Sequence, residues 1–223
     1  MDNGKSRIAV IGGTGELGSG LARLWSAAGY PIVIGSRAKE RGVAAAQELA
    51  RQTSTDVSGD DNRGAARHAE IVTLCVPYSN HDSIIEEIAP VMAGKILVDA
   101  VVPLVPPKVS VVHLPPAGSP ALAAQRRLGG VRVAAAFHNV SAKKLHEGRK
   151  ADCDVLVFSD DGQVRARIIR LADVIATRGV DGGALANAVA AEALTSVLIA
   201  INRRYKIAGA GIRITGLPSD DAR

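Results

Sequence analysis

An apolar segment followed at once by a cluster of glycines is the feature that most limits how this chain can fold. Residues 7–20 read RIAVIGGTGELGSG, and six of them fit the pattern G-x-G-x-x-G: Gly13, Thr14, Gly15, Glu16, Leu17 and Gly18. In this pattern the first glycine permits a tight turn, the second lets the backbone approach a pyrophosphate, and the third lets the next helix pack on the sheet. The N–H groups and the positive dipole at the helix start then attract the anion. The stretch therefore predicts a dinucleotide site between a strand and a helix.

The chain after this loop alternates between expected strands and expected helices. We expect strands at 8–11, 31–34, 71–76, 95–98, 131–137 and 154–158. We expect helices at 15–28, 38–51, 79–89, 120–128, 162–176 and 184–203, with a short one within 141–148. Residues 53–69 are expected to hold at most a short strand and a turn, the proline-rich segment 101–124 is expected to be largely irregular, and 178–183 receives no assignment. This alternation predicts an α/β fold with a Rossmann-type, doubly wound parallel sheet over residues 6–138.

The composition agrees with such a sheet and limits the partners. Of the 223 residues 47 % are hydrophobic but only 3 % aromatic, so the core is aliphatic, as parallel strands covered by helices require. The net charge of +5 comes from scattered basic residues, and few aromatic side chains are present to stack on bases. We therefore expect a phosphorylated small molecule as the anionic partner and no nucleic acid.

Cysteine usage and the ends of the chain predict a cytoplasmic protein. Cys75 and Cys153 lie in apolar runs without metal or disulfide spacing, so we expect buried thiols in a reducing compartment and no metal site. The polar start of the sequence does not resemble a signal peptide. The apolar stretch 184–203 contains Asn187 and Glu192, which favours a helix buried in the core or against a second copy of the chain over a membrane span.

The end of the second expected strand indicates which dinucleotide binds. An NAD site usually has Asp or Glu there, whereas this chain has Gly35, Ser36 and Arg37, followed by Lys39 and Arg41. The planar guanidinium of Arg37 can hold phosphate oxygens. Cations in a first helical turn also oppose the helix dipole, so an anionic ligand is the better explanation for them than a solvated helix start. These residues predict NADP(H).

The sequence lacks the acid–base groups of several reductase classes. None of the three tyrosines has a lysine four residues later, so the Tyr-x-x-x-Lys pair of short-chain dehydrogenases is absent. There is also no G-x-S-x-G motif. The reaction expected here therefore needs little acid–base machinery.

Several segments, in order, resemble those of the F420-dependent NADP reductases. They are IAVIGGTGELGSGLA, IVIGSR, LCVPYSNH, VAAAFHNVSAKKL, DVLVFSDD and LTSVLIAINRRYKIAGAGIRI, and they extend from about residue 7 to residue 217. The resemblance implies direct hydride transfer between the nicotinamide C4 of NADP(H) and C5 of a deazaflavin, coenzyme F420. It also implies that residues 139–217 form a small α/β lobe, ending in the long apolar helix, that completes the second-cofactor cleft and provides a possible homodimer surface.

By the same resemblance, particular side chains are expected at each end of the cofactors. Thr14, Ser36, Arg37 and Arg41 hold the 2′-phosphate end of NADP. Val76, Pro77 and Tyr78 lie beside the nicotinamide, and His138, Asn139 and Thr195 face the second ring.

Each of the latter positions has a structural alternative that the sequence leaves open. Pro77 can simply end a strand, and His138, the candidate catalytic residue, can instead hydrogen-bond backbone at a strand end. Thr195 can be a packing residue. The family more often has Trp at the place of Tyr78, and segment 101–124 has no close match. Other acceptors (a flavin, a pterin or a ferric chelate) and a non-catalytic NADP(H)-binding or sensing role therefore remain alternatives.

Overall fold

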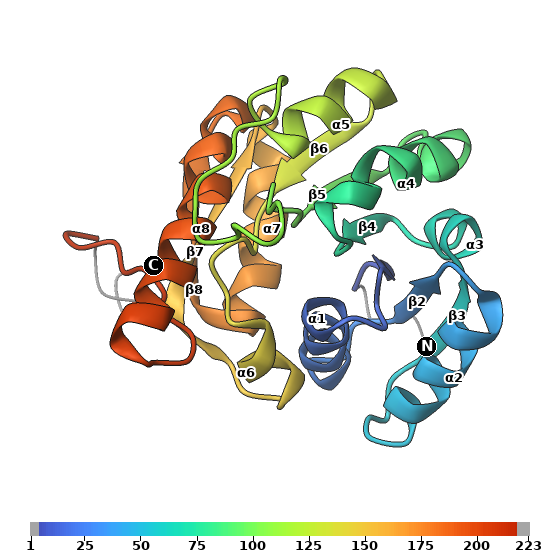
Figure 1. Cartoon of the computed structure of the whole chain (residues 1–223). Coiled ribbons are helices and arrows are strands. Elements are labelled where there is room, and N and C mark those ends of the chain that lie inside the picture. The colour runs from blue at the N-terminus through green and yellow to red at the C-terminus, as the bar shows by residue number, and fades with distance from the viewer. Residues whose placement is uncertain (1–4, 218–223) are drawn as a thin grey trace.

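One mixed sheet runs through the computed structural model, which describes residues 5–217 (Figure 1). The strands in this part of the chain are β1 Ile8–Ile11, β2 Ile32–Ser36, β3 Val57–Asp61, β4 Ile71–Leu74, β5 Ile96–Asp99, β6 Arg132–Ala135, β7 Ala151–Ser159 and β8 Ala176–Gly183. Their order across the sheet is β3-β2-β1-β4-β5-β6-β7-β8. The first six are parallel, β7 is antiparallel to β6, and β8 is parallel to β7. This arrangement confirms the expected Rossmann-type fold, with its topological switch between β1 and β4.

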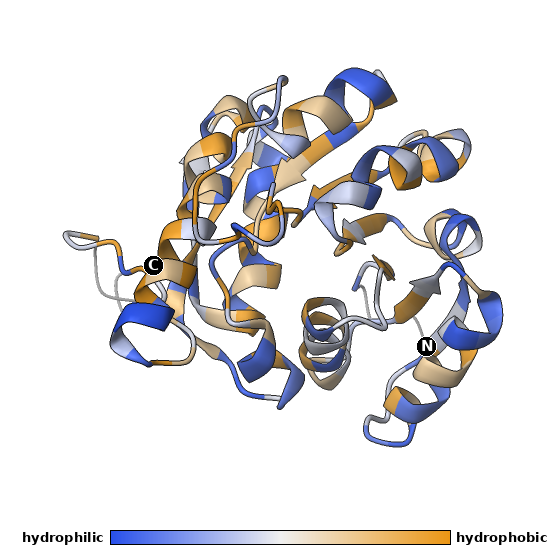
Figure 2. Ribbon diagram, in the orientation of Figure 1, coloured by the Kyte–Doolittle hydropathy of each residue, from blue (hydrophilic) through white to orange (hydrophobic). Residues whose placement is uncertain are grey.

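Helices cover both faces of the sheet, because the central strands β1, β2, β4, β5 and β6 contribute buried apolar residues to the core on either side. These strands are coloured mainly as hydrophobic in Figure 2. On one face lie α1 Glu16–Ala27, α2 Lys39–Ala50, α6 Ala142–His146 and α7 Gly162–Ile175. On the other lie α3 Asn62–Arg67, α4 His81–Ile88, α5 Pro120–Leu128 and the start of α8 Ala188–Tyr205. Short 3-10 turns, Tyr78–Asn80, Ala89–Val91 and Leu185–Asn187, adjoin α4 and α8. Along β1, Ile8 and Val10 face the first layer, while Ala9 and Ile11 face the second.

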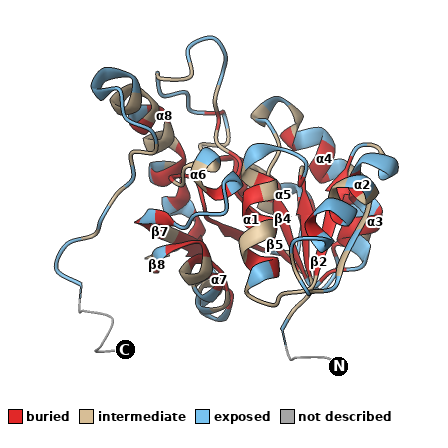
Figure 3. Cartoon of the chain, turned by 90° about the horizontal axis from the view of Figure 1, so that it is seen from below, coloured by how far each residue is buried: buried red, intermediate tan, exposed pale blue. Residues whose placement is uncertain are grey.

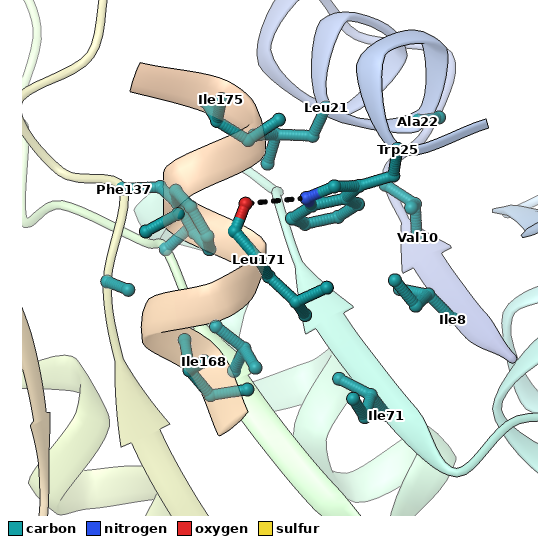
Figure 4. Packing of buried hydrophobic residues seen from close by; sticks show 14 of the residues in the cluster. Ile8, Val10, Leu21, Ala22, Trp25, Ile71, Phe137, Ile168, Leu171 and Ile175 are labelled. Atoms are coloured by element: carbon teal, nitrogen blue, oxygen red, sulfur yellow. Dashed lines mark hydrogen bonds between the residues drawn. The ribbon is translucent and has the colours of Figure 1, made fainter. Parts of the chain in front are cut away.

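Trp25 joins the N-terminal and C-terminal parts of the chain in one core (Figure 4). Its indole is fully buried and donates a 3.0 Å hydrogen bond from Nε1 to the backbone carbonyl of Leu171 in α7. The edge of its ring meets Phe137, with 5.5 Å between the ring centroids and 72° between the planes. Strands β7 and β8, which belong to the lobe expected at 139–217, therefore share both the sheet and the core of the first six strands; the division of the chain at residue 138 stays a prediction.

Two elements differ from the expectations. Helix α3 forms within 53–69, where only a strand and a turn are expected, because Asp61 caps it by accepting a 2.6 Å hydrogen bond from the backbone N–H of Gly64. Strand β8 forms in the glycine-rich 176–183 because tertiary packing outweighs the low strand preference of glycine. A Cβ at Gly179 would lie 2.9 Å from the carbonyl of Ile169, and one at Gly182 would lie 2.3 Å from the ring of Phe158.

Helix α8 is buried along one face only (Figure 3). Its buried residues are Ala188, Ala191, Glu192, Ser196 and Leu198, whereas Val197 is 43 % exposed. By length and composition alone, Leu185–Tyr205 is long and apolar enough to cross a membrane. Buried core helices of other proteins also meet these two criteria. The polar Glu192 and Ser196 lie on the covered face, which points to a helix that packs against its own chain.

Candidate cofactor site

A cleft of about 270 Å³ opens at the carboxyl ends of β1, β2 and β4, beside the topological switch. Ligands of open α/β sheets bind at this place. Among the residues predicted to bind a cofactor, seven line this cleft: Thr14, Gly15, Ser36, Arg37, Arg41, Val76 and Pro77. Six further lining residues are not predicted from the sequence: Gly12, Ala38, Asn62, Cys75, Asn80 and Ile84.

The glycine loop forms a bare cradle at one end of the cleft. Gly12 has a positive φ of 77°, and a Cβ there would lie 2.5 Å from the carbonyl oxygen of Cys75. The tight turn after β1 therefore occurs at Gly12, one residue before the expected glycine. A Cβ at Gly18 would lie 2.5 Å from the carbonyl of Gly12, so this glycine lets α1 pack against the loop. At Gly15 a Cβ would meet only the Gly12 carbonyl, at 3.4 Å, which leaves open space where a phosphate can approach.

Helix α1 starts at this cradle without a side-chain cap. Its N-cap is Gly15, which has no side chain to accept from the first N–H groups. Uncapped N–H groups and the helix dipole favour an anion at this point. The remaining loop positions, Glu16 and Leu17, begin the helix; Glu16 is exposed and Leu17 packs partly on the core.

The cations after β2 divide into two groups. Arg37 and Arg41 line the cleft, and neither forms an ion pair with another residue of the described chain. Lys39 instead pairs with Asp60 at 3.0 Å, and hydrogen bonding to that carboxylate raises the pKa of its ammonium group. The adjacent Asp61 caps α3. Both carboxylates at the end of β3 are thus already engaged, and the two arginines remain available for an anion.

Comparison with known proteins shows to which family the chain belongs. Residues 7–103, from the glycine loop through β5, match the family described as "NADP oxidoreductase coenzyme F420-dependent". The F420-dependent NADP reductase of Methanothermobacter marburgensis is 40 % identical to this chain over 95 % of the chain and 99 % of the relative. The chain belongs to the F420-dependent NADP reductase family. The enzyme of that name from Methanocaldococcus jannaschii is 38 % identical over 95 % of this chain and 99 % of its own.

A solved structure of another protein has the same fold as this chain. It is a provisionally named F420-dependent NADP-reductase from Arthrobacter sp. FB24, and the match covers 94 % of this chain and 99 % of that one. The TM-score is 0.78 at 24 % sequence identity. At that identity the likeness supports the fold alone.

Tyr78, predicted beside the nicotinamide, and the residues predicted at the second ring, His138, Asn139 and Thr195, do not line this cleft. Tyr78 is half-buried and lines a separate cleft of about 190 Å³ with Pro115, Pro116 and Pro120 from the proline-rich segment. Its ring lies 6.3 Å from that of His113, centroid to centroid. The proline-rich segment therefore packs against the end of the cleft where Pro77 stands.

His138, Asn139 and Thr195 lie together after the end of β6. Asn139 Nδ2 donates a 2.8 Å hydrogen bond to the carbonyl of Asp154, and Thr195 Oγ1 donates one of 2.8 Å to the carbonyl of His138. His138 is 5 % exposed, and among residues 5–217 neither ring nitrogen forms a hydrogen bond of good geometry. Burial lowers the pKa of this ring to about 4, although the nearby backbone and charge of Asp99 act in the opposite direction, so the ring is neutral at pH 7. Asn139 and Thr195 thus fix the backbone here, and the His138 ring is buried next to Asp99.

A second set of buried polar side chains lies around the carboxyl end of β5, and the sequence analysis does not predict it as part of the site. His81 Nε2 and Asp99 Oδ2 are 2.8 Å apart, and both residues are almost fully buried. Glu192 is also buried and accepts a 2.7 Å hydrogen bond from Ser119 Oγ. The sequence features that could have indicated these residues are an aspartate at the end of an apolar strand (Asp99) and a glutamate within an apolar helix (Glu192). Across the described residues, no group of three or more His, Cys, Asp or Glu side chains is placed to hold a metal ion.

Proposed function

We propose that this protein transfers a hydride between NADP(H) and a deazaflavin, coenzyme F420. The observation that carries the proposal is the cleft itself, in which a bare glycine cradle and two unpaired guanidinium groups stand at the switch point of the sheet. Relatives named F420-dependent NADP reductases match almost the whole chain. The chain is on this basis an NADP-dependent oxidoreductase.

Residues 6–138 bind NADP(H). The loop from Gly13 to Gly18 receives the pyrophosphate through backbone N–H groups. Ser36, Arg37 and Arg41 receive the 2′-phosphate, and an Arg fork matches the geometry of phosphate oxygens. Val76 and Pro77, after β4, stand beside the nicotinamide.

Residues 139–217 complete the site of the second cofactor. The structural feature that fits a polar ligand here is the buried imidazole of His138, because unpartnered buried polar atoms are costly unless a ligand or water satisfies them. Asn139 and Thr195 hold the backbone near His138, and Tyr78 contributes from the separate cleft that it shares with the proline-rich segment.

The bound cofactors supply the hydride chemistry, and the protein supplies orientation and a dry site. Pro77 and Val76 form a rigid wall after β4. The apolar residues of the sheet edge exclude water. Because both reactants are cofactors, no Tyr-Lys pair or metal ion is needed for the transfer.

The protein acts in the cytoplasm as a homodimer. The apolar side chains that favour a second copy of the chain lie on and just after α8: Val197, Tyr205 and Ile207 are 43 %, 71 % and 50 % exposed. Sedimentation of the purified protein tests this assembly. Sedimentation as a monomer at all concentrations contradicts it.

Mixing the protein with NADPH and oxidised F420 tests the function. We expect loss of the absorbance of the oxidised deazaflavin, with one NADPH consumed per deazaflavin reduced. Parallel reactions with a flavin, a pterin and a ferric chelate identify any other acceptor. Binding of NADPH without reduction of any acceptor contradicts an enzymatic role and leaves a binding or sensing role.

A further inference from the structure

One wall of the cofactor cleft is a single short segment that follows β4. It comprises the end of that strand's loop, the 3-10 turn Tyr78–Asn80 and the first turn of α4, and we call residues 75–84 the nicotinamide wall. Its members that line the cleft are Cys75, Val76, Pro77, Asn80 and Ile84. Because the proposed function places the nicotinamide against this wall, whatever fixes the wall also fixes the reacting ring.

The backbone of the wall has few hydrogen bonds to the rest of the chain. Cys75 N–H is bonded to the carbonyl of Ile11 in β1. After this point the backbone bonds stay within the wall, from Asn80 N–H to the Pro77 carbonyl and from the next N–H to the carbonyl of Tyr78. Among residues 5–217, the hydrogen bonds that join 76–83 to other segments come from the side chains of two adjacent residues, 81 and 82.

The first of these residues, His81, is buried between two carboxylates. It begins α4 and is 1 % exposed. Its Nε2 lies 2.8 Å from Oδ2 of Asp99, which is fully buried at the end of β5, and its Nδ1 lies 3.0 Å from Oδ1 of Asp82. Ionised carboxylates only accept, so each ring nitrogen is placed to donate. Burial alone would lower the pKa of His81, but the hydrogen bonds and charges of both carboxylates outweigh it and raise this pKa.

The two partners of His81 are themselves held, and they differ in exposure. On the inner side, Asp99 Oδ1 accepts a 3.0 Å hydrogen bond from the backbone N–H of Val101. On the outer side, Asp82 Oδ2 accepts one of 2.6 Å from Arg127 Nη2 in α5. Asp82 and Arg127 are 56 % and 41 % exposed, and exposed pairs contribute little. The buried bond between His81 and Asp99 is therefore the one that ties the wall to the sheet.

We propose, resting on the proposed function, that His81 is the positioning residue of the nicotinamide wall. Its bond to Asp99 fixes the start of α4 against the carboxyl end of β5, and thereby fixes Pro77 and Asn80 in the cleft. His81 lines the separate cleft of Tyr78 and not the cofactor cleft, so it acts through the wall. Hydride transfer depends on the alignment of the rings, and a misplacement of about 1 Å can slow such a reaction about 100-fold.

The phosphate end of the cofactor provides an internal reference. The glycine loop and Arg37 belong to other elements, so binding of adenosine 2′,5′-bisphosphate, which lacks the nicotinamide, does not depend on His81. Two amide substitutions then separate the two bonds of the ring. The amide nitrogen of glutamine is as many bonds from Cα as Nε2 of histidine, and that of asparagine as many as Nδ1. His81→Gln therefore keeps a donor for Asp99, whereas His81→Asn keeps only a donor for Asp82.

Hydrogen exchange of the ligand-free protein tests the position of the wall without activity. We expect faster exchange of the backbone amides of 78–84 in His81→Asn than in the wild type, and a much smaller change in His81→Gln. Glu86→Gln, which breaks an exposed ion pair on the same helix, is the control and should exchange like the wild type. Wild-type exchange in His81→Asn contradicts the proposal.

Single-turnover transfer from saturating NADPH to oxidised F420 tests the consequence for the reaction. His81→Asn should slow the transfer about 100-fold, with the affinity for adenosine 2′,5′-bisphosphate unchanged. His81→Gln should remain close to the wild type. If His81→Asn does not fold, Asp99→Asn, which keeps the shape of the side chain and removes its charge, takes its place and should slow the transfer in the same way.

The outcomes separate this proposal from the proposed function. Equal slowing in His81→Gln and His81→Asn, or a parallel loss of adenosine 2′,5′-bisphosphate affinity, overturns the positioning role and leaves hydride transfer intact. Failure of the wild type to reduce F420 while it binds NADPH overturns the proposed function instead. The exchange comparison of the ligand-free variants then judges the position of the wall by itself.

Discussion

The ammonium group of Lys39 lies 3.0 Å from the carboxylate of Asp60, and this pair removes one of the three cations after β2 from the cofactor cleft. Arg37 and Arg41 remain on the cleft wall. The three basic side chains look equivalent in the sequence, and the neighbouring strand β3 distinguishes them. We therefore propose that these two guanidinium groups recognise the extra phosphate of NADP.

Arg37→Ala should weaken NADPH far more than NADH. Loss of a charge-assisted bidentate contact to the 2′-phosphate costs about 2 kcal/mol, or ~30-fold in the dissociation constant. Calorimetric titration with both cofactors measures the difference. Lys39→Ala is the matched control and should change the two affinities by much less, because Lys39 is bound to Asp60. Equal losses for NADPH and NADH in Arg37→Ala would show that Arg37 does not recognise this phosphate.

Gly12→Ala should damage the cofactor site, and Gly94→Ala should not. The two glycines have nearly the same positive φ, 77° and 74°, so alanine is strained by about 1–2 kcal/mol at either position. At Gly94 no atom lies within 4 Å of the added Cβ, whereas at Gly12 the carbonyl oxygen of Cys75 would be 2.5 Å away. We expect both variants to lose stability in chemical denaturation, and only Gly12→Ala to lose NADPH binding in addition.

The comparison of these two variants separates backbone strain from close approach. If Gly94→Ala loses NADPH binding as well, a general loss of stability accounts for the effect. If Gly12→Ala binds NADPH normally, the loop moves far enough to relieve the 2.5 Å contact between the added Cβ and the Cys75 carbonyl oxygen without damage to the site.

Local sequence signals predict the strand, turn and helix around the glycine loop, because these elements follow one another within a few residues. The residues assigned to the 2′-phosphate line the cleft, and their role stays a prediction. The alternation of strands and helices predicts the fold class, the residues after the second strand predict NADP(H), and the family resemblance adds coenzyme F420; the comparisons confirm all three. The pattern G-x-G-x-x-G places the turn at Gly13, but the structure has it at Gly12, where φ is 77° and a Cβ would lie 2.5 Å from the carbonyl oxygen of Cys75. Gly12 begins a different spacing, G-x-x-G-x-x-G, so the sequence alone does not decide between the two glycines.

The distant contacts of the site could not be predicted. Thr195 bonds to His138 over 57 residues, and Ser119 bonds to Glu192 over 73 residues. Spacing along the chain carries no signal for such pairs. The antiparallel pairing of β7 with β6 could not be predicted from hydrophobic periodicity either, because an apolar strand has the same pattern in both directions. The residues assigned to the second cofactor accordingly stay predictions.

Trp25→Phe should lower the free energy of unfolding by about 2 kcal/mol. The substitution removes the 3.0 Å hydrogen bond to the Leu171 carbonyl and leaves a small cavity between α1 and α7 (Figure 4). Trp25 is the single tryptophan of the chain, so the variant has no tryptophan fluorescence with which to follow unfolding. Denaturation followed by circular dichroism therefore measures the change in both proteins. Val111→Ala, at a side chain that is 61 % exposed, is the control and should leave the stability nearly unchanged. A loss below about 0.5 kcal/mol in Trp25→Phe would mean that the two helices close over the vacated space.

Arg178→Met should destabilise the C-terminal part of the sheet, and most strongly at neutral pH. Arg178 holds the fully buried carboxylate of Asp154 through two bonds of 3.0 Å, from Nε and Nη2, and Ile214 N–H adds a third of 2.7 Å. Burial alone would raise the pKa of Asp154, but these hydrogen bonds and the positive charge of Arg178 lower it below 3.8. The pair therefore stabilises the fold above pH 3.8, and this contribution is lost as the pH falls through the lowered pKa.

Without Arg178 the burial of Asp154 dominates and favours the neutral acid. We expect Arg178→Met to cost about 3 kcal/mol near pH 7, where the buried carboxylate keeps only the Arg213 guanidinium at 4.0 Å and the Ile214 N–H, and progressively less on acidification. Urea denaturation at a series of pH values measures both the cost and its slope. Arg51→Met, which breaks an exposed pair with Glu48, is the control and should cost less than about 1 kcal/mol at every pH. A pH-independent cost in Arg178→Met would mean that lost side-chain packing, rather than the charge of Asp154, is responsible.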